Sequence, residues 1–207
     1  GPCVFSLHLA AGAIATGLCN TVLLTYGTNL RSAGASFGGG TLDWHTLAGL
    51  VHIAGPAAMA ARRHMHLYGT TEEQLGWVSV AQREWAQNNP IAIFKEPMSI
   101  ADYMASPYVV EPLRRSDLTM ISDGGCACIL TSAERAKDFK KPPVLISGFG
   151  GRETYAPSNI ANFDMDMWYP ATKDAGEQAY GMAGVTTKDV DGLMVYDNFS
   201  PTVLFSL

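Results

Sequence analysis

The fold class is decided by one stretch near the start of the chain, AAGAIATG at residues 10–17, and by the run TVLLTYG at residues 21–27 that follows it. Small apolar residues from Phe5 to Gly17 predict a buried helix that ends at the glycine. The apolar, β-rich run after Asn20, bounded by turn residues, predicts a short buried strand. A buried helix that leads directly into a buried strand is typical of layered α/β proteins.

Helices are predicted at intervals along the rest of the chain. Thr70-Thr71-Glu72-Glu73 combines a threonine cap with an acidic first turn, and Asn88-Asn89-Pro90 ends the same helix. Ser99 is expected to cap a shorter helix. The stretch Trp44–Leu67 is expected to be helical with a break at Gly55-Pro56. Further helices are predicted at Ala133–Phe139, Thr172–Met182 and Pro201–Leu207.

Apolar runs between these helices predict further strands. Leu118–Ser122 and Cys126–Thr131 flank Asp123-Gly124-Gly125, which is a strong hairpin signal. The remaining strands are predicted at Val144–Ser147 and Val190–Phe199. Because strands alternate with helices, we expect a layered α/β fold with a mixed sheet.

Composition excludes several classes of protein. The 207 residues carry a formal net charge of -5, which argues against nucleic-acid binding because phosphate recognition needs a basic surface. The two most apolar stretches, Val4–Leu24 and Leu47–Ala61, are interrupted by polar residues or proline, so no membrane span is expected. Four cysteines are too few for a disulfide framework, which indicates a cytoplasmic protein with reduced thiols.

Several of these segments, taken in order, resemble the thiolase superfamily. Residues 10–17 and VLL at 22–24 resemble the helix and strand that follow the thiolase nucleophile. YGTTEEQL at 68–75 resembles lipid-transfer-type thiolases. The same order continues with DY at 102–103, SP at 106–107, PL at 112–113, SDGGCA at 122–127 and YDNF at 196–199.

The resemblance implies the thiolase fold, two similar halves that are each a mixed sheet between helices, in an α/β/α arrangement. Residues 1–141 would be part of the N-terminal half with a helical region inserted at about 31–113, and residues 142–207 would begin the C-terminal half. The chain has no initiating Met and ends within a predicted helix, so we expect it to be an interior portion of that fold.

Cys3 is the obvious candidate for the thiolase nucleophile, since a thiolate at a helix N-terminus is activated. Counting back from Ile14 and Gly17, however, the nucleophile position of the family falls just upstream of Gly1. Cys3 is therefore interpreted as a small buried hydrophobic residue.

Tyr196 occupies the position where thiolases carry an Asn or His before an acidic residue and a Phe, here Asp197 and Phe199. A tyrosine there resembles the lipid-transfer branch, whose members include retro-aldolases that shorten steroid side chains carried as coenzyme A thioesters. The resemblance makes Tyr196 the catalytic acid or base. Asp197 would orient the turn or the phenol, and its alternative role is a turn-capping carboxylate. The alternative for Tyr196 is an ordinary tyrosine at a strand end.

Other polar residues carry weaker signals. His45 and His52, or His64 and His66, lack further ligands at metal-site spacing, so no metal is expected. Cys126 and Cys128 are expected to be two buried residues on one face of a strand. GFGG at 148–151 predicts a tight turn, since no Lys-Ser/Thr follows it.

The resemblance leads to a carbon–carbon lyase that acts on a bulky, steroid-like β-hydroxyacyl-coenzyme A. It needs no cofactor beyond the coenzyme A of the substrate, and the residues that bind this coenzyme A are not assigned. The resemblance also implies a homodimer and an OB-fold/zinc-ribbon partner protein. Two alternatives stay open: an acyltransferase (thiolase) whose Cys nucleophile lies outside this chain, and a non-catalytic lipid carrier.

Overall fold

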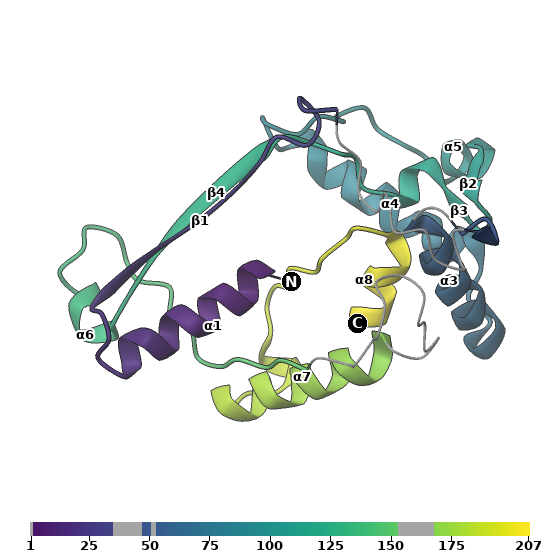
Figure 1. Cartoon of the computed structure of the whole chain (residues 1–207). Coiled ribbons are helices and arrows are strands. Elements are labelled where there is room, and N and C mark those ends of the chain that lie inside the picture. Colours follow the sequence, from purple (N-terminus) through teal and green to yellow (C-terminus); the bar gives the residue numbers. More distant parts are fainter. Residues whose placement is uncertain (1, 35–46, 51–52, 153–167) are drawn as a thin grey trace. The chain divides into compact units, whose positions relative to one another are not determined.

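The computed structural model describes residues 2–34, 47–50, 53–152 and 168–207 (Figure 1). The chain divides into two compact units, and each is described by itself. The first comprises Gly1–Ser36, Ile121–Arg152 and Asp174–Asp191, and the second comprises Phe37–Met120, Glu153–Lys173 and Gly192–Leu207. No helix within the described ranges is long and apolar enough to cross a membrane.

The first unit is organised around a two-stranded ribbon. Helix α1 (Pro2–Ala15) is followed by strand β1 (Thr21–Thr28), which pairs antiparallel with β4 (Gly124–Thr131). Gly17, just beyond α1, has a φ of 76°, so the predicted glycine stop is confirmed. Helix α1 contacts both strands of the ribbon.

The hairpin predicted around Asp123-Gly124-Gly125 is wrong, because β4 pairs with β1 instead. Gly125 lies opposite Gly27, and a Cβ added to Gly125 would lie 2.8 Å from a backbone oxygen of β1. The Asp123 carboxylate accepts hydrogen bonds from the backbone N–H groups of Arg31 (2.9 Å) and Ser32 (3.1 Å). Gly125 therefore allows the two strands to approach closely, and Asp123 anchors a loop. The local pattern of residues 123–125 does not distinguish these roles from a turn.

The expected burial of α1 and β1 is not found within the part of the chain that is described. Among the α1 residues whose burial is described, only Ala10 is buried, and Leu23 of β1 is 62% exposed. The physical reason is that β1 has no second strand neighbour among the described residues. Cys126 and Cys128 of β4 are exposed for the same reason, and Cys3 of α1, for which burial is also predicted, is exposed as well.

The remainder of the first unit is helix and extended chain. It includes α6 (Ala133–Ala136), most of α7 (Trp168–Ala183) and the short 3-10 helix η2 (Thr187–Asp189). Val144–Ser147 forms no strand, so that prediction is wrong, and Val144 is 94% exposed. The predicted tight turn at 148–151 is also not found. Gly148 and Gly150 lie so close to the backbone of α7 that a Cβ on either would collide with it.

The second unit is mainly helical. Its elements are α3 (Ala54–Tyr68), α4 (Glu72–Gln87), α5 (Ile100–Ala105), β2 (Tyr108–Val110), β3 (Leu113–Arg114), the 3-10 helix η1 (Arg115–Asp117) and α8 (Ser200–Ser206). Strands β2 and β3 pair antiparallel. Gly55-Pro56 lies in the first turn of α3 and does not break it, because a proline there removes no helical hydrogen bond.

Both predicted helix caps are confirmed. The Thr71 hydroxyl accepts a hydrogen bond from the backbone N–H of Gln74, whose side chain accepts one from the Thr71 N–H in return. Ser99 and Asp102 form the same reciprocal arrangement at the start of α5. These capping boxes fix the starts of α4 and α5.

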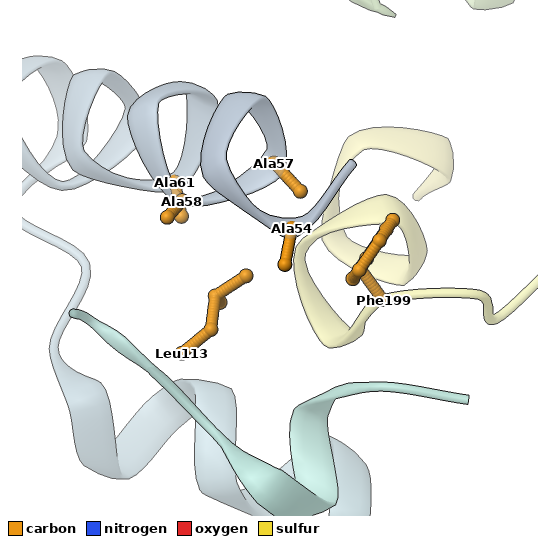
Figure 2. Close-up of a cluster of buried hydrophobic side chains, with 6 residues drawn as sticks. All are labelled: Ala54, Ala57, Ala58, Ala61, Leu113 and Phe199. Carbon is orange, nitrogen blue, oxygen red and sulfur yellow. The ribbon is translucent and has the colours of Figure 1, made fainter. Parts of the chain in front are cut away.

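A small core joins α3 to β3 and to the chain before α8, as Figure 2 shows. Phe199 and Leu113 pack there against four alanines of α3, at positions 54, 57, 58 and 61. Alanines keep α3 narrow on this side, which allows close approach. The predicted strand Val190–Phe199 is wrong, since only Phe199 makes a strand-like bridge, to Leu118.

Candidate active site

The turn Tyr196–Phe199 is held at its carboxyl end. Phe199 is buried in the core described above, and it forms an antiparallel bridge with Leu118. The backbone N–H of Thr119 donates to the carbonyl oxygen of Asn198 at 3.0 Å. Helix α8 begins directly afterwards, with Pro201 in its first turn, where its fixed φ favours helix initiation. The backbone after Tyr196 is therefore anchored to both the core and a neighbouring segment.

Tyr196 itself extends outward from this anchored backbone. Its side chain is largely exposed, at 73% of its full accessible surface. A phenol in this setting has room for a ligand to approach its hydroxyl. It can donate a hydrogen bond or exchange a proton with such a ligand.

Asp197 is held by a side chain of α4. The amide nitrogen Nε2 of Gln82 donates to Oδ2 of Asp197 at 2.9 Å. Within the described part of the chain, no hydrogen bond joins the phenol of Tyr196 to this carboxylate. Asp197, which follows Tyr196 directly in the sequence, is oriented by a glutamine that sequence reasoning missed. Gln82 and Asp197 are 115 positions apart in sequence, and no local signal connects them.

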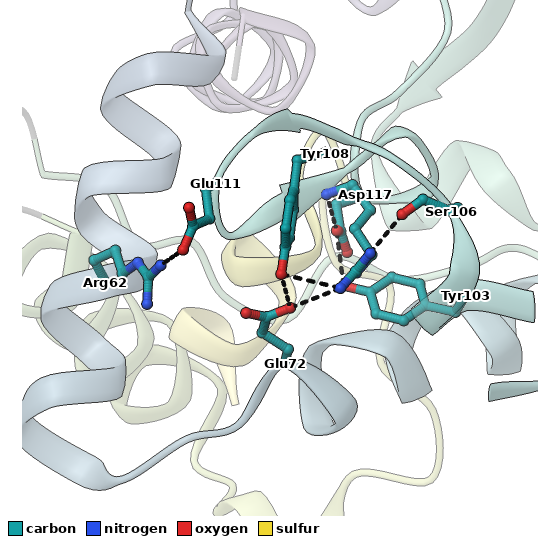
Figure 3. Close-up of polar contacts among 8 residues, drawn as sticks. Arg62, Glu72, Tyr103, Ser106, Tyr108, Glu111 and Asp117 are labelled. Atoms are coloured by element: carbon teal, nitrogen blue, oxygen red, sulfur yellow. Dashed lines mark hydrogen bonds and ion pairs between the residues drawn. The ribbon is translucent and has the colours of Figure 1, made fainter. Parts of the chain in front are cut away.

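A second polar cluster lies deeper in the same unit, and Figure 3 shows its contacts. Asp117 accepts hydrogen bonds from the Tyr103 hydroxyl at 2.8 Å and from the Arg114 backbone N–H at 2.7 Å. The Arg114 guanidinium donates to the Glu72 carboxylate and to the Tyr108 hydroxyl, each at 3.0 Å. It also lies over the Tyr108 ring, 4.2 Å from the centroid. Glu72 neutralises the Arg114 guanidinium, whereas Asp117 is held by the two hydrogen bonds to its Oδ2.

Burial sets the acid–base properties of this cluster. Burial raises the pKa of the Asp117 carboxyl, although hydrogen bonds from Arg114, Ser200 and Tyr103 oppose the shift. Burial, with the nearby Asp117 charge second, raises the pKa of the Tyr103 phenol. Tyr103 and Asp117 are 0% and 2% exposed, so solvent does not reach the pair. The role of this cluster is therefore structural: it stabilises the fold of the second unit.

The histidines and the cysteine that the sequence also offered as candidates lie in different parts of the chain. The Nδ1 atom of His64 lies 3.0 Å from the Thr70 hydroxyl, and its ring packs against Tyr68 and Phe205. His45 and His52 lie outside the described residues. Cys3 is a free, exposed cysteine on α1. In the described ranges, no three His, Cys, Asp or Glu side chains gather as a metal site.

Comparison with known proteins gives this geometry its context. The family model described as "Thiolase C-terminal domain-like" matches residues 155–207, the segment that contains Tyr196 and Asp197. The "Steroid side-chain-cleaving aldolase" of Thermomonospora curvata is 34% identical over 214 residues, which cover 96% of this chain and 55% of that protein. The solved structure of an "Ltp2-ChsH2(DUF35) aldolase" superposes with a TM-score of 0.85 at 33% identity, over 99% of this chain and 55% of that one.

The chain belongs to the thiolase superfamily. The predicted α/β thiolase fold is thereby confirmed. A further relative of this thiolase-superfamily chain is the "17-hydroxy-3-oxo-4-pregnene-20-carboxyl-CoA lyase" of Mycobacterium tuberculosis, 34% identical over 224 residues. That match covers 100% of this chain and 58% of the relative. These relatives place the chain in the lipid-transfer and aldolase branch of the superfamily.

The chain spans between half and two thirds of the length of the curated relatives it matches, 55% and 58% in the two cases above. The division of this thiolase-superfamily chain at residues 141 and 142 stays a prediction, as do the catalytic roles of Tyr196 and Asp197.

Proposed function

We propose that the full-length protein is a carbon–carbon lyase that cleaves a bulky, steroid-like β-hydroxyacyl-coenzyme A by a retro-aldol reaction. The observation that carries this proposal is the exposed phenol of Tyr196 on an anchored turn, beside a carboxylate that Gln82 orients. The names of the two curated relatives, an aldolase that cleaves steroid side chains and a lyase of a pregnene carboxyl-coenzyme A, support the reaction and the substrate class.

The reaction needs one proton removed and one proton delivered. A base takes the proton of the β-hydroxyl group, the Cα–Cβ bond breaks, and its electron pair moves into the thioester as an enolate. The β-carbon leaves as a ketone. Protonation of the enolate at Cα then gives the shortened acyl-coenzyme A. Tyr196 serves as the acid or base in this sequence, because its phenol accepts or donates a proton at one oxygen. Hydrogen-bond donors stabilise the enolate oxygen.

Partner and location belong to the same proposal. The solved aldolase is named for two components, Ltp2 and ChsH2(DUF35), which supports an OB-fold/zinc-ribbon partner for this protein. The active assembly contains a homodimer of the thiolase-fold protein in the cytoplasm. No cofactor is required, since the substrate carries its own coenzyme A.

The decisive experiment uses the full-length protein with its partner and a steroid acyl-coenzyme A that bears a β-hydroxyl group. Products are identified by mass spectrometry in the absence of free coenzyme A. Release of a steroid ketone together with propionyl-coenzyme A is the expected result. Cleavage that occurs only after free coenzyme A is added indicates thiolysis and overturns the lyase assignment. Binding of the substrate without any cleavage indicates a lipid carrier and overturns it too.

A further inference from the structure

We infer that Gln82 is a positioning residue of this site, which acts on the reaction through Asp197; the inference rests on the function proposed above. Gln82 lies in the middle of α4, far in sequence from the turn it contacts. Its amide donates to the Asp197 carboxylate rather than to the Tyr196 phenol, so its role is to hold another side chain in place.

Helix α4 contacts the turn region with two polar side chains. Gln82 donates to Asp197, and three residues earlier the Ser79 hydroxyl lies 3.3 Å from the Ser200 hydroxyl. Ser79 also donates to the carbonyl oxygen of Ser116 at 2.9 Å. Residues three apart share one face of a helix, so one face of α4 holds both ends of the segment 197–200.

The Gln82 contact reaches the side of the turn next to Tyr196. Backbone contacts from Leu118 and Thr119 hold Phe199 and Asn198, and the core holds the Phe199 ring. None of these contacts fixes the rotamer of Asp197. The hydrogen bond from Gln82 does so, and it leaves Oδ1 of the carboxylate to accept a further bond from the phenol or the substrate.

The residue at position 82 needs a hydrogen-bond donor on a side chain long enough to reach the Asp197 carboxylate. The amide of Gln82 orients the carboxylate by donating one hydrogen bond to it. Methionine has nearly the same length but no donor. Lysine retains a donor of similar reach, whereas glutamate would place a second negative charge beside Asp197. These three residues separate loss of the hydrogen bond from loss of packing.

The test compares Gln82→Met, Gln82→Lys and Gln82→Glu in the full-length protein with its partner. We expect Gln82→Met to lower kcat about fivefold, equivalent to ~1 kcal/mol, with KM changed less than about twofold. Gln82→Glu is expected to lose at least as much, and Gln82→Lys to retain most of the activity. Gln87→Met on the same helix is the matched control. Five residues rotate the helix by about 140° relative to Gln82, so no change in activity is expected there.

A double-mutant cycle decides whether Gln82 acts through Asp197. In an Asp197→Ala background, Gln82→Met should cause no further loss, because the partner is already gone. Equal kcat for wild type and Gln82→Met, no rescue by lysine, or losses that simply multiply with Asp197→Ala would each overturn the inference. If wild type itself fails to cleave, the proposed function falls and this inference with it. An active wild type with an unaffected Gln82→Met removes only the role of Gln82.

Discussion

Two tyrosine–aspartate pairs in the second unit have the same functional groups but differ in their burial. Tyr103 and Asp117 are buried and hydrogen-bonded to each other at 2.8 Å (Figure 3). Tyr196 and Asp197 are adjacent in a turn, are both exposed, and share no hydrogen-bond partner within the described residues. Burial therefore commits the first pair to the fold, and exposure leaves the second pair available to a ligand.

The difference follows from where each group finds its hydrogen-bond partner. Inside the protein, a polar group without a partner loses its hydration with nothing in return, and Oδ2 of Asp117 accepts its hydrogen bonds from Tyr103 and Arg114. At the surface, water takes the place of a missing hydrogen-bond partner, so the free energy of unfolding changes little. Changes to the buried pair should thus affect stability, and changes to the exposed pair should affect activity.

The largest expected effect is on catalysis at the exposed pair. Tyr196→Phe removes the hydroxyl that exchanges a proton, and acid–base groups of this kind contribute about 10²–10⁴-fold to a rate. We expect kcat for aldol cleavage to fall within that range, while the free energy of unfolding changes by less than about 0.5 kcal/mol. Steady-state kinetics and urea denaturation measure the two quantities.

Tyr26→Phe is the matched control for this change. Tyr26 is a partly exposed tyrosine on β1, in the other compact unit. Its replacement should leave kcat unchanged. Full activity in Tyr196→Phe would remove Tyr196 from the mechanism.

The next largest effect is on stability at the buried pair. Asp117→Ala leaves the Tyr103 hydroxyl and the Arg114 N–H without an acceptor, and each buried donor left without a partner typically costs about 1–3 kcal/mol. Asp197→Ala should lower the free energy of unfolding by less than about 0.5 kcal/mol, since its carboxylate is exposed. Urea denaturation of the two variants compares the pairs directly, and equal losses would contradict the contrast.

The smallest effect is a pH dependence that belongs to Asp117. Burial raises its folded-state pKa above the ordinary value of 3.8, so between those two values the folded protein keeps a proton that the unfolded chain has lost. The contribution of this carboxyl is therefore fully present below pH 3.8 and decreases as the pH rises through the raised pKa. We expect the free energy of unfolding of wild type, minus that of Asp117→Asn, to fall as the pH rises from 3.8 through the raised pKa of Asp117.

Subtraction of the variant isolates this effect. Hydrogen bonds lower the pKa of four exposed carboxyl groups, which contribute with the opposite sign and cancel because both proteins contain them. They are Asp102, Asp123, Glu134 and Asp189. A difference that rises with pH would show that the Asp117 pKa is lowered in the folded protein.

Local signals in the sequence were sufficient for the helices. Both capping boxes, at Thr71 and Ser99, involve residues three apart, and a pattern at that spacing determines its own structure. The glycine stop at Gly17 is local in the same sense. The position of Tyr196 was found from the order of motifs along the chain, which does not depend on contacts.

Features that depend on distant residues were missed. Gly124-Gly125 marks a turn by its local pattern, yet it pairs with residues 27 and 28, nearly a hundred positions away. The Gln82–Asp197 hydrogen bond likewise joins residues that are far apart in sequence. The strands predicted at Val144–Ser147 and Val190–Phe199 have suitable composition, but a strand also needs a neighbour to pair with.

The pairing of Thr21 with Thr131 has a consequence for how the chain tolerates change in length. Their hydroxyls lie 3.4 Å apart across 110 residues of sequence, so the ribbon closes a loop that contains most of the second unit. The entropy of loop closure grows only with the logarithm of length, and even a doubling of this loop would add about 0.6 kcal/mol. Insertions between β1 and β4 should therefore change the free energy of ribbon formation little. Formation of the ribbon, by contrast, requires a long-range encounter and should be slow compared with the helices it encloses.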